Sequence, residues 1–230
     1  MELKSTLKKI LEQGTVLSTS GSTGKPKQIK QPVKKLLAAN SVAREVQDIN
    51  SNSRILTVCT LEHAGGLLAQ TLPAFEIDAH IEVQSFNAFA WVRQIQDYTH
   101  SHLTPDMARA VLKTKGFEEL DLTGITIMCG SDRVSSQLIQ AYIDRGATFI
   151  ANWGMTEVGP VAINKTYKPG DIVNNTESIM GDTAWCDIKF INGTELHVYG
   201  DICVYDDWFP TGDLVKVDGP VLYYLGREND

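Results

Sequence analysis

The chain has 230 residues, which is enough to bury a sizeable core in one domain or in two closely packed lobes. Hydrophobic residues make up 43% of it and charged residues 21%, as in ordinary soluble globular proteins, and the formal net charge of −7 argues against a protein that mainly binds the nucleic acid backbone. No apolar run approaches the roughly 18 residues of a membrane span, and the first residues show no signal-peptide pattern. We therefore expect a cytoplasmic protein with no nucleic acid or membrane partner.

The first part of the chain alternates between strand and helix patterns. A helix-like stretch over residues 3–11 and a short strand over 15–20 come first, and Pro32 is expected in the first turn of the next helix. Strands are then predicted over residues 54–60, 79–85, 98–103, 124–130 and 147–154. Helices are predicted between them, over residues 65–75, 87–96, 104–113 and 135–146, with Thr104 as an N-cap and Gly146 past a helix end. Such alternation indicates a parallel sheet with crossover helices.

After about Pro160 the helical periodicity disappears. Residues 194–205, 213–219 and 220–226 read as antiparallel strands with turns between them, and a lobe boundary is expected between Val161 and Thr183. The predicted fold class is therefore α/β: a mostly parallel sheet with crossover helices over residues 1–165, followed by a small antiparallel β lobe over residues 166–230.

The four cysteines do not suggest a metal site. Cys59, Cys129, Cys186 and Cys203 share no metal-ligand spacing, and several lie in apolar runs. Buried, reduced thiols are the expected state.

A loop rich in glycine and hydroxyl residues, LSTSGSTGKPKQIK over residues 17–30, is suited to hold phosphate. It is not a Walker A loop, because Pro26 follows Gly24-Lys25 where that motif needs Ser or Thr at a helix start. It resembles the phosphate loop of the acyl-adenylate-forming (AMP-binding) superfamily, [ST]-S-G-[ST]-T-G-x-P-K. The pattern is matched at every position by Thr19, Ser20, Gly21, Ser22, Thr23, Gly24, Lys25, Pro26 and Lys27. Glycines allow close backbone approach, and hydroxyls with Lys27 can satisfy phosphate oxygens; a plain Ser/Gly surface loop is the alternative.

Further blocks follow in the order of this superfamily. LEHAGGL, over residues 61–67, resembles the segment in which a His precedes glycines beside the acyl pocket, although His63 alone would more often be a helix-start residue. LTPDMARAVLK is similar to a helix of the family. IMCGSDRVSSQLI resembles the segment whose backbone borders the adenine, which implies nucleotide contacts at Gly130 and Ser131. Ser131 and Asp132 depart from the usual small and proline-containing residues there.

The block NWGMTE, residues 152–157, is similar to a family block that reads N-x-[YFW]-G-x-T-E in various forms. The resemblance implies that Trp153 lies against the adenine, that Thr156 contacts the α-phosphate and that Glu157 holds Mg²⁺. A flat aromatic ring offers a stacking face, and one or two carboxylates with phosphate oxygens commonly hold this ion. The implied nucleotide contacts here are Asn152, Trp153, Gly154, Met155 and Thr156. A strand end with Trp for packing and Glu for solvation is the alternative.

Two blocks near the end complete the resemblance. PTGDL contains Asp213, whose counterpart in the family accepts hydrogen bonds from both ribose hydroxyls, whereas T-G-D alone would be only a turn. LGREND resembles a hinge block, in which Arg227 would reach the ribose or phosphate and the hinge residue would be Asn229 or Asp230. The implied catalytic residues are Thr156, Glu157 and His63, with Glu157 as the metal ligand.

The resemblance implies a minimal acyl-adenylate-forming ligase of the acyl-CoA synthetase branch, with residues 1–165 as its nucleotide-binding core. Its ligands would be ATP or AMP, Mg²⁺, a carboxylic acid and CoA. The long N-terminal portion of the family and its C-terminal lid domain, with a catalytic lysine, have no counterpart in these 230 residues. A separate chain could supply the lid, and a sheet face left uncovered would favour a homodimer. A non-catalytic AMP or acyl-adenylate binding module is the rival function, and an unrelated phosphate-binding α/β domain is a third.

Overall fold

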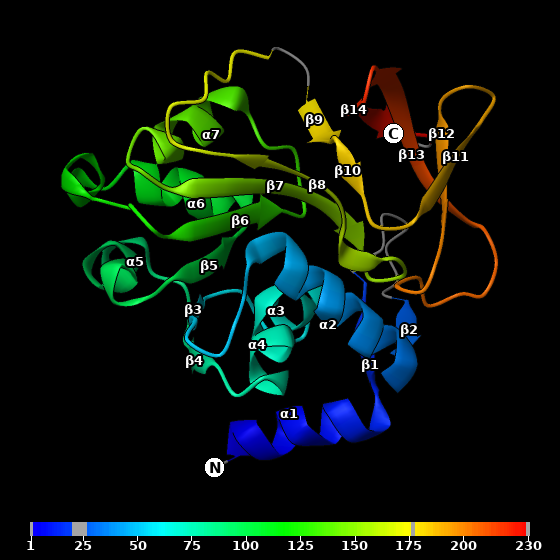
Figure 1. Ribbon diagram of the computed structural model, residues 1–230, viewed down its shortest axis with the longest axis horizontal. Coiled ribbons are helices and arrows are strands. Elements are labelled where there is room, and N and C mark those ends of the chain that lie inside the picture. Colours follow the sequence, from blue (N-terminus) through cyan, green and yellow to red (C-terminus); the bar gives the residue numbers. More distant parts are fainter. Residues whose placement is uncertain (1, 20–26, 176–177, 229–230) are drawn as a thin grey trace.

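The computed structural model describes residues 2–19, 27–175 and 178–228 (Figure 1). The helices are α1 (Glu2–Gln13), α2 (Val33–Gln47), α3 (Ala64–Gly66), α4 (Leu72–Glu76), α5 (Ala88–Gln94), α6 (Pro105–Leu112) and α7 (Ser136–Ile143). The strands are β1 (Thr15–Ser18), β2 (Gln28–Gln31), β3 (Arg54–Thr57), β4 (His80–Val83), β5 (His100–Leu103), β6 (Thr126–Gly130), β7 (Thr148–Met155), β8 (Gly159–Tyr167), β9 (Ser178–Gly181), β10 (Thr183–Ala184), β11 (Asp187–Ile191), β12 (Glu195–Tyr199), β13 (Phe209–Asp218) and β14 (Val221–Arg227).

A seven-stranded sheet forms the centre of the molecule, in the order β10-β8-β7-β6-β5-β3-β4. Its neighbours from β4 to β7 pair in parallel, and β8 and β10 add an antiparallel edge. The predicted α/β fold with a mostly parallel sheet and crossover helices is therefore confirmed.

Helices cover both faces of this sheet, and successive side chains along a central strand such as β6 are buried on opposite faces. Ile127 and Cys129 share a core with α5, α6 and α7, whereas Met128 packs on the opposite face with Ala43 of α2 and Ala69. Helix α1 packs against α2 and α4 at the edge of the molecule (Figure 1). The uncovered face that led us to expect a homodimer is not seen in the described part of the chain, so self-association stays a prediction, which light scattering can test.

Helix boundaries follow the sequence signals with one correction. Thr104 accepts a hydrogen bond from the Met107 N–H as the N-cap of α6, and Gly146 has a φ of 94° just beyond α7. Pro32, however, lies outside its helix: with ψ at 146° it is the N-cap of α2, and its carbonyl accepts the first intrahelical bond from Leu36 at 3.0 Å. The predicted helix over 65–75 is present as α3 and α4, joined by a π-helical turn over Leu67–Thr71.

A second, five-stranded antiparallel sheet has the order β11-β12-β13-β14-β9. It stands beside the first sheet in Figure 1, and the antiparallel β lobe is thereby confirmed. The chain passes between the sheets more than once, since β9 joins the second sheet and the next strand, β10, returns to the first.

All four cysteines are free thiols; three are buried and Cys186 is partly buried. Burial raises the pKa of Cys59 to about 11, which keeps it protonated at neutral pH. Within the described ranges, no helix has the length and apolar character needed to cross a membrane.

His102 on β5 should make stability depend on pH. The side chain is 4% exposed, and its Nδ1 lies 2.8 Å from the Gly65 carbonyl oxygen, which can only accept a hydrogen bond. Burial lowers the pKa of His102 from 6.5 to about 4. Between these pH values the unfolded chain binds the proton and the folded chain does not, so stability falls as the pH falls. The difference between the two pKa values corresponds to about 3 kcal/mol of unfolding free energy.

Urea unfolding between pH 6.5 and 4 tests this expectation. Carboxyl groups titrate in the same range, so the control is His102→Asn, whose amide can still donate to Gly65. The wild type should lose more stability than this variant over the range, and parallel profiles would contradict the assignment.

Candidate nucleotide-binding site

Two adjoining cavities lie where the two sheets meet. The smaller has a volume of about 250 Å³ and the larger about 940 Å³. Their walls share Ser131, Asn152, Gly154, Met155 and Arg227. The predicted site residues from the middle and the end of the chain therefore surround one continuous region.

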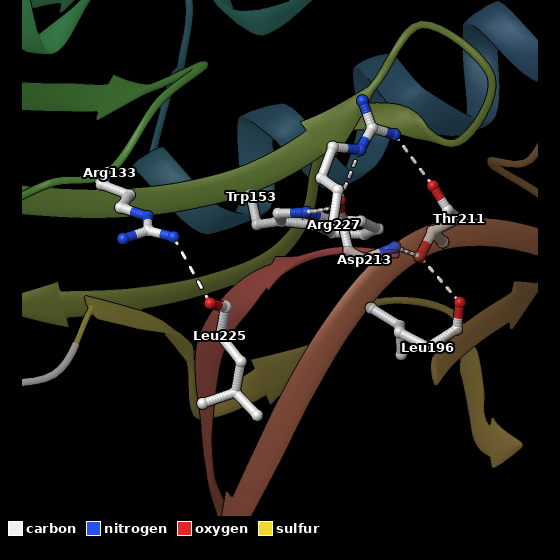
Figure 2. A network of polar contacts seen from close by, with 7 residues as sticks. All are labelled: Arg133, Trp153, Leu196, Thr211, Asp213, Leu225 and Arg227. Atoms are coloured by element: carbon white, nitrogen blue, oxygen red, sulfur yellow. Dashed lines mark hydrogen bonds and ion pairs between the residues drawn. The ribbon is translucent and has the colours of Figure 1, made fainter. Parts of the chain in front are cut away.

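The smaller cavity is bounded by both sheets. The segment after β6 and the end of β7 supply Ser131, Arg133 and Trp153, while β13 and β14 supply Asp213 and Tyr224. The Arg133 guanidinium lies 5.0 Å from the centre of the Tyr224 ring, a cation–π contact, and its Nη2 is 3.4 Å from the Leu225 carbonyl oxygen (Figure 2). The wall thus combines aromatic faces with charged groups of both signs.

Asp213 lies at the centre of a polar network in this wall. Trp153 Nε1 donates to Asp213 Oδ2 at 2.7 Å, and Arg227 Nε lies 3.0 Å from Asp213 Oδ1 (Figure 2). Arg227 also donates from Nη2 to the Thr211 carbonyl at 3.0 Å. Asp213 is only 5% exposed, and buried charges of this kind need such partners.

The turn that carries Asp213 is held in place by Thr211. Its hydroxyl donates to the Leu196 carbonyl on β12 at 2.7 Å and accepts from the Asp213 N–H at 3.0 Å. Gly212 between them has a φ of 71°, a left-handed conformation that glycine adopts without cost. The T-G-D sequence is thus explained by local geometry as well as by its place in the wall.

Asn152 lies in the walls of both cavities. Its Nδ2 donates to the Pro160 carbonyl at 2.6 Å, while its buried Oδ1 has no hydrogen-bond partner among the described residues. Gly130 lies directly beneath it and is not part of either wall: a Cβ there would be 2.4 Å from the Asn152 carbonyl oxygen. Next to it, Ser131 has a φ of 75°, unusual for a residue other than glycine.

Gly154→Ala should strongly destabilise the fold. A Cβ at this position would lie 2.3 Å from the Gly159 carbonyl oxygen and 2.4 Å from the Pro160 carbonyl carbon, both backbone atoms of the neighbouring strand. Overpacking of this kind costs about 1–3 kcal/mol, which corresponds to a melting temperature lower by about 3–10 °C in a chain of this size. Thermal unfolding followed by circular dichroism measures the change.

Gly116→Ala is the matched control, because its Cβ would meet only the end of the Val92 side chain, which can move. Equal melting temperatures for the two variants would show that the backbone contact at Gly154 is unimportant.

The larger cavity brings together residues from the remaining blocks. Thr19, Lys27, His63, Thr156 and Glu157 all line it, and the exposed His63 stands at the N-cap position of α3. At the base of the phosphate loop, the Thr19 N–H donates to the Lys27 carbonyl at 2.9 Å, so β1 and β2 close the loop from below. The loop residues themselves, Ser20, Gly21, Ser22, Thr23 and Gly24, lie outside the described residues, as do Asn229 and Asp230.

Hydrogen bonds to their main-chain carbonyl oxygens hold Thr156 and Glu157 at the cavity wall. Gln31 Nε2 donates to the Thr156 carbonyl at 2.7 Å, and the Glu157 carbonyl accepts from the Val204 N–H at 2.9 Å. Glu157 is 8% exposed. No group of three or more His, Cys, Asp or Glu side chains in the described ranges could hold a metal ion alone. A single carboxylate beside a phosphate site nevertheless suits Mg²⁺, which takes its other ligands from phosphate and water.

Several wall residues were not predicted from the sequence. Arg133, Tyr224 and Phe209 line the cavities, and Gln31 supports Thr156 from behind. Arg133 lies within the recognised block IMCGSDRVSSQLI, so its position could have suggested a role. Gln31 and Tyr224 belong to ordinary strand patterns, which carry no signal for a site.

Comparisons with known proteins place the chain in a family. A family model described as AMP-binding enzyme matches residues 15–208. Indoleacetate–CoA ligase from Aromatoleum aromaticum is 28% identical over 244 residues, which cover 92% of this chain and 47% of that protein. Feruloyl-CoA synthase from an Amycolatopsis species is 31% identical over 150 residues, 63% of this chain and 30% of that protein. The chain thus spans about half the length of the first relative, and less of the second.

Solved structures share the fold. O-succinylbenzoate Coenzyme A synthetase from Bacillus subtilis, in complex with AMP, superposes with a TM-score of 0.78 at 22% identity, over 95% of this chain and 50% of that one. The N-terminal domain of FACL13 from Mycobacterium tuberculosis gives 0.77 at 18% identity, over 92% and 60%. The family model covers well over half of the residues. The chain therefore belongs to the family of AMP-binding enzymes.

Proposed function

We propose that this chain binds ATP and AMP in the two adjoining cavities and activates a carboxylic acid as an acyl-adenylate. The observation that carries the proposal is the Asp213 network. It places a buried carboxylate, an indole and an arginine in one wall, within a cavity system that also reaches the base of the phosphate loop. These are the groups that a ribose, an adenine and a phosphate require.

Each part of the nucleotide has a matching group. Trp153 offers an aromatic face for the adenine. Asp213 can accept hydrogen bonds from the ribose hydroxyls, since an ionised carboxylate has about four acceptor positions. Lys27, Thr19 and Thr156 in the larger cavity can contact phosphate oxygens.

In the proposed reaction a carboxylate oxygen attacks the α-phosphorus of ATP, forming the acyl–phosphate bond, and pyrophosphate leaves with the electron pair of the broken bond. The chain's residues bind and orient the two reactants, which supplies a large part of the barrier reduction. Glu157 is the residue that would hold Mg²⁺, and this ion neutralises phosphate charge when bound. His63, at the wall of the larger cavity, would lie beside the acid.

The larger cavity has room for the acid beside the phosphates. The relatives named for indoleacetate and feruloyl substrates suggest aromatic acids as the first candidates, with CoA as the acceptor of the acyl group. Whether the acid is aromatic is tested by comparing indole-3-acetate and ferulate with short aliphatic acids.

Two measurements test the proposal. Isothermal titration calorimetry should detect AMP binding and Mg²⁺-dependent ATP binding. Pyrophosphate exchange into ATP, run with the panel of acids, should rise above a no-acid blank for at least one of them. Absence of AMP binding would contradict the whole proposal.

The alternative function is a non-catalytic AMP or acyl-adenylate binding module. It needs only the binding groups in the walls of the two cavities, without a catalytic group from elsewhere. Exchange above the blank would exclude it. AMP binding without exchange would support it, or would point to a separate lid chain that restores exchange when added.

A further inference from the structure

Trp153 and Asp213 join the two sheets across the smaller cavity. Trp153 belongs to β7 of the central sheet and Asp213 to β13 of the second sheet, 60 positions later in the chain. The indole N–H donates to Asp213 Oδ2 at 2.7 Å, a short, charge-assisted hydrogen bond (Figure 2). One side chain therefore offers a ring face to the cavity and an N–H to the carboxylate.

We propose that Trp153 is a positioning residue for ribose recognition: its indole N–H orients the Asp213 carboxylate so that this carboxylate selects nucleotides carrying the ribose diol. The inference rests on the proposed function, because it takes Asp213 as the ribose contact. It goes further in giving Trp153 a task that an adenine-stacking ring alone would not have.

The contacts around Asp213 define the plane of its carboxylate. Trp153 holds Oδ2, Arg227 holds Oδ1 at 3.0 Å, and the Thr211 hydroxyl accepts from the Asp213 N–H at 3.0 Å. The side-chain torsion of an aspartate carboxylate is otherwise broad, so a donor on each oxygen narrows it. Arg227 is about one third exposed, whereas Asp213 is almost completely buried. Trp153, like Arg227, is only partly buried, so both donors reach the almost completely buried carboxylate from the cavity wall.

The choice of tryptophan is specific to this arrangement. The sequence pattern of the block admits Tyr, Phe or Trp at this position, and each provides an aromatic face. Phe has no hydrogen-bond donor, and Tyr carries its hydroxyl at the far end of the ring. Tryptophan alone places an N–H on the ring edge that meets Asp213.

The test compares Trp153→Phe with the wild type against two ligands, AMP and 2′,3′-dideoxy-AMP, by isothermal titration calorimetry. The variant keeps the aromatic face and loses the N–H. Its affinity for AMP should fall about tenfold, as for loss of one hydrogen bond to a charged group. Its affinity for the dideoxy ligand should change by less than about twofold. This ligand lacks the ribose hydroxyls, so the orientation of the Asp213 carboxylate by Trp153 has no effect on its binding. Trp208→Phe is the matched control, since Trp208 lies outside both walls and contacts Tyr199 and Lys189 instead.

Each outcome is decisive. A larger loss for AMP than for the dideoxy ligand supports the inference, and equal losses overturn it by showing that Trp153 acts through its ring face alone. A wild type that binds both ligands equally well also overturns it, while leaving AMP binding intact. A wild type that binds neither ligand overturns the proposed function and the inference together. Should Trp153→Phe not fold, Trp153→Tyr carries the same comparison.

Discussion

Asp213→Ala should weaken AMP binding by about 10- to 150-fold. The substitution removes a buried, charged acceptor from the proposed ribose contact, which corresponds to about 1.5–3 kcal/mol. It also leaves Trp153 Nε1 and Arg227 Nε without the partner that each has in the structure. Calorimetric titration with AMP measures the affinity directly.

Asp218→Ala is the matched control for this variant. Asp218 is an exposed residue at the end of the same strand, β13, and lies in neither cavity wall. Its variant should bind AMP as the wild type does. If Asp213→Ala bound AMP equally well, the assignment of the ribose site would be wrong.

Glu157→Gln should slow acyl-adenylate formation by about 10²–10³-fold, the usual loss when one electrostatic stabiliser of a transition state is removed. The substitution keeps the size of the side chain. It also keeps the main-chain carbonyl of residue 157, which accepts a hydrogen bond from the Val204 N–H, so the wall should keep its shape. It removes only the charge that would hold Mg²⁺. Pyrophosphate exchange with the best acid gives the rate.

AMP binding without Mg²⁺ separates a metal role from a structural one. This affinity should change by less than about twofold in Glu157→Gln, because AMP lacks the β- and γ-phosphates and its binding is measured here without the metal that Glu157 would hold. A parallel loss of exchange and of metal-free AMP binding would show that Glu157 supports the fold of the wall and is no metal ligand. If the wild type shows no exchange, Mg²⁺-dependent ATP affinity is the readout for the same comparison.

Local sequence patterns were sufficient for most of the fold. The apolar run that contains Ile127, Met128 and Cys129 predicted a strand, and in the structure these side chains divide between the two helical layers. Thr104 was recognised as an N-cap because its role depends only on residues nearby in sequence. Pro32 was misplaced by one position, since its fixed φ of −65° suits both an N-cap and the first helical residue.

The contacts that build the candidate site were beyond such patterns. Trp153 and Asp213 are 60 positions apart, and Gln31 and Thr156 are 125 apart. Their pairing depends on how two sheets meet, which periodicity within one strand does not specify. Gly130 shows the same limit: the resemblance implied a contact with the nucleotide, which stays a prediction, but it gave no sign that a Cβ here would lie 2.4 Å from the Asn152 carbonyl oxygen.

A crystal structure of the chain with AMP would show whether one AMP molecule binds between the two sheets, as we propose. We expect the adenine against the Trp153 ring and the ribose hydroxyls within hydrogen-bond distance of Asp213. The phosphate should lie toward Lys27 and Thr156. Crystals grown at saturating AMP that show the Trp153–Asp213 cavity empty, or AMP bound at another surface, would contradict this proposal.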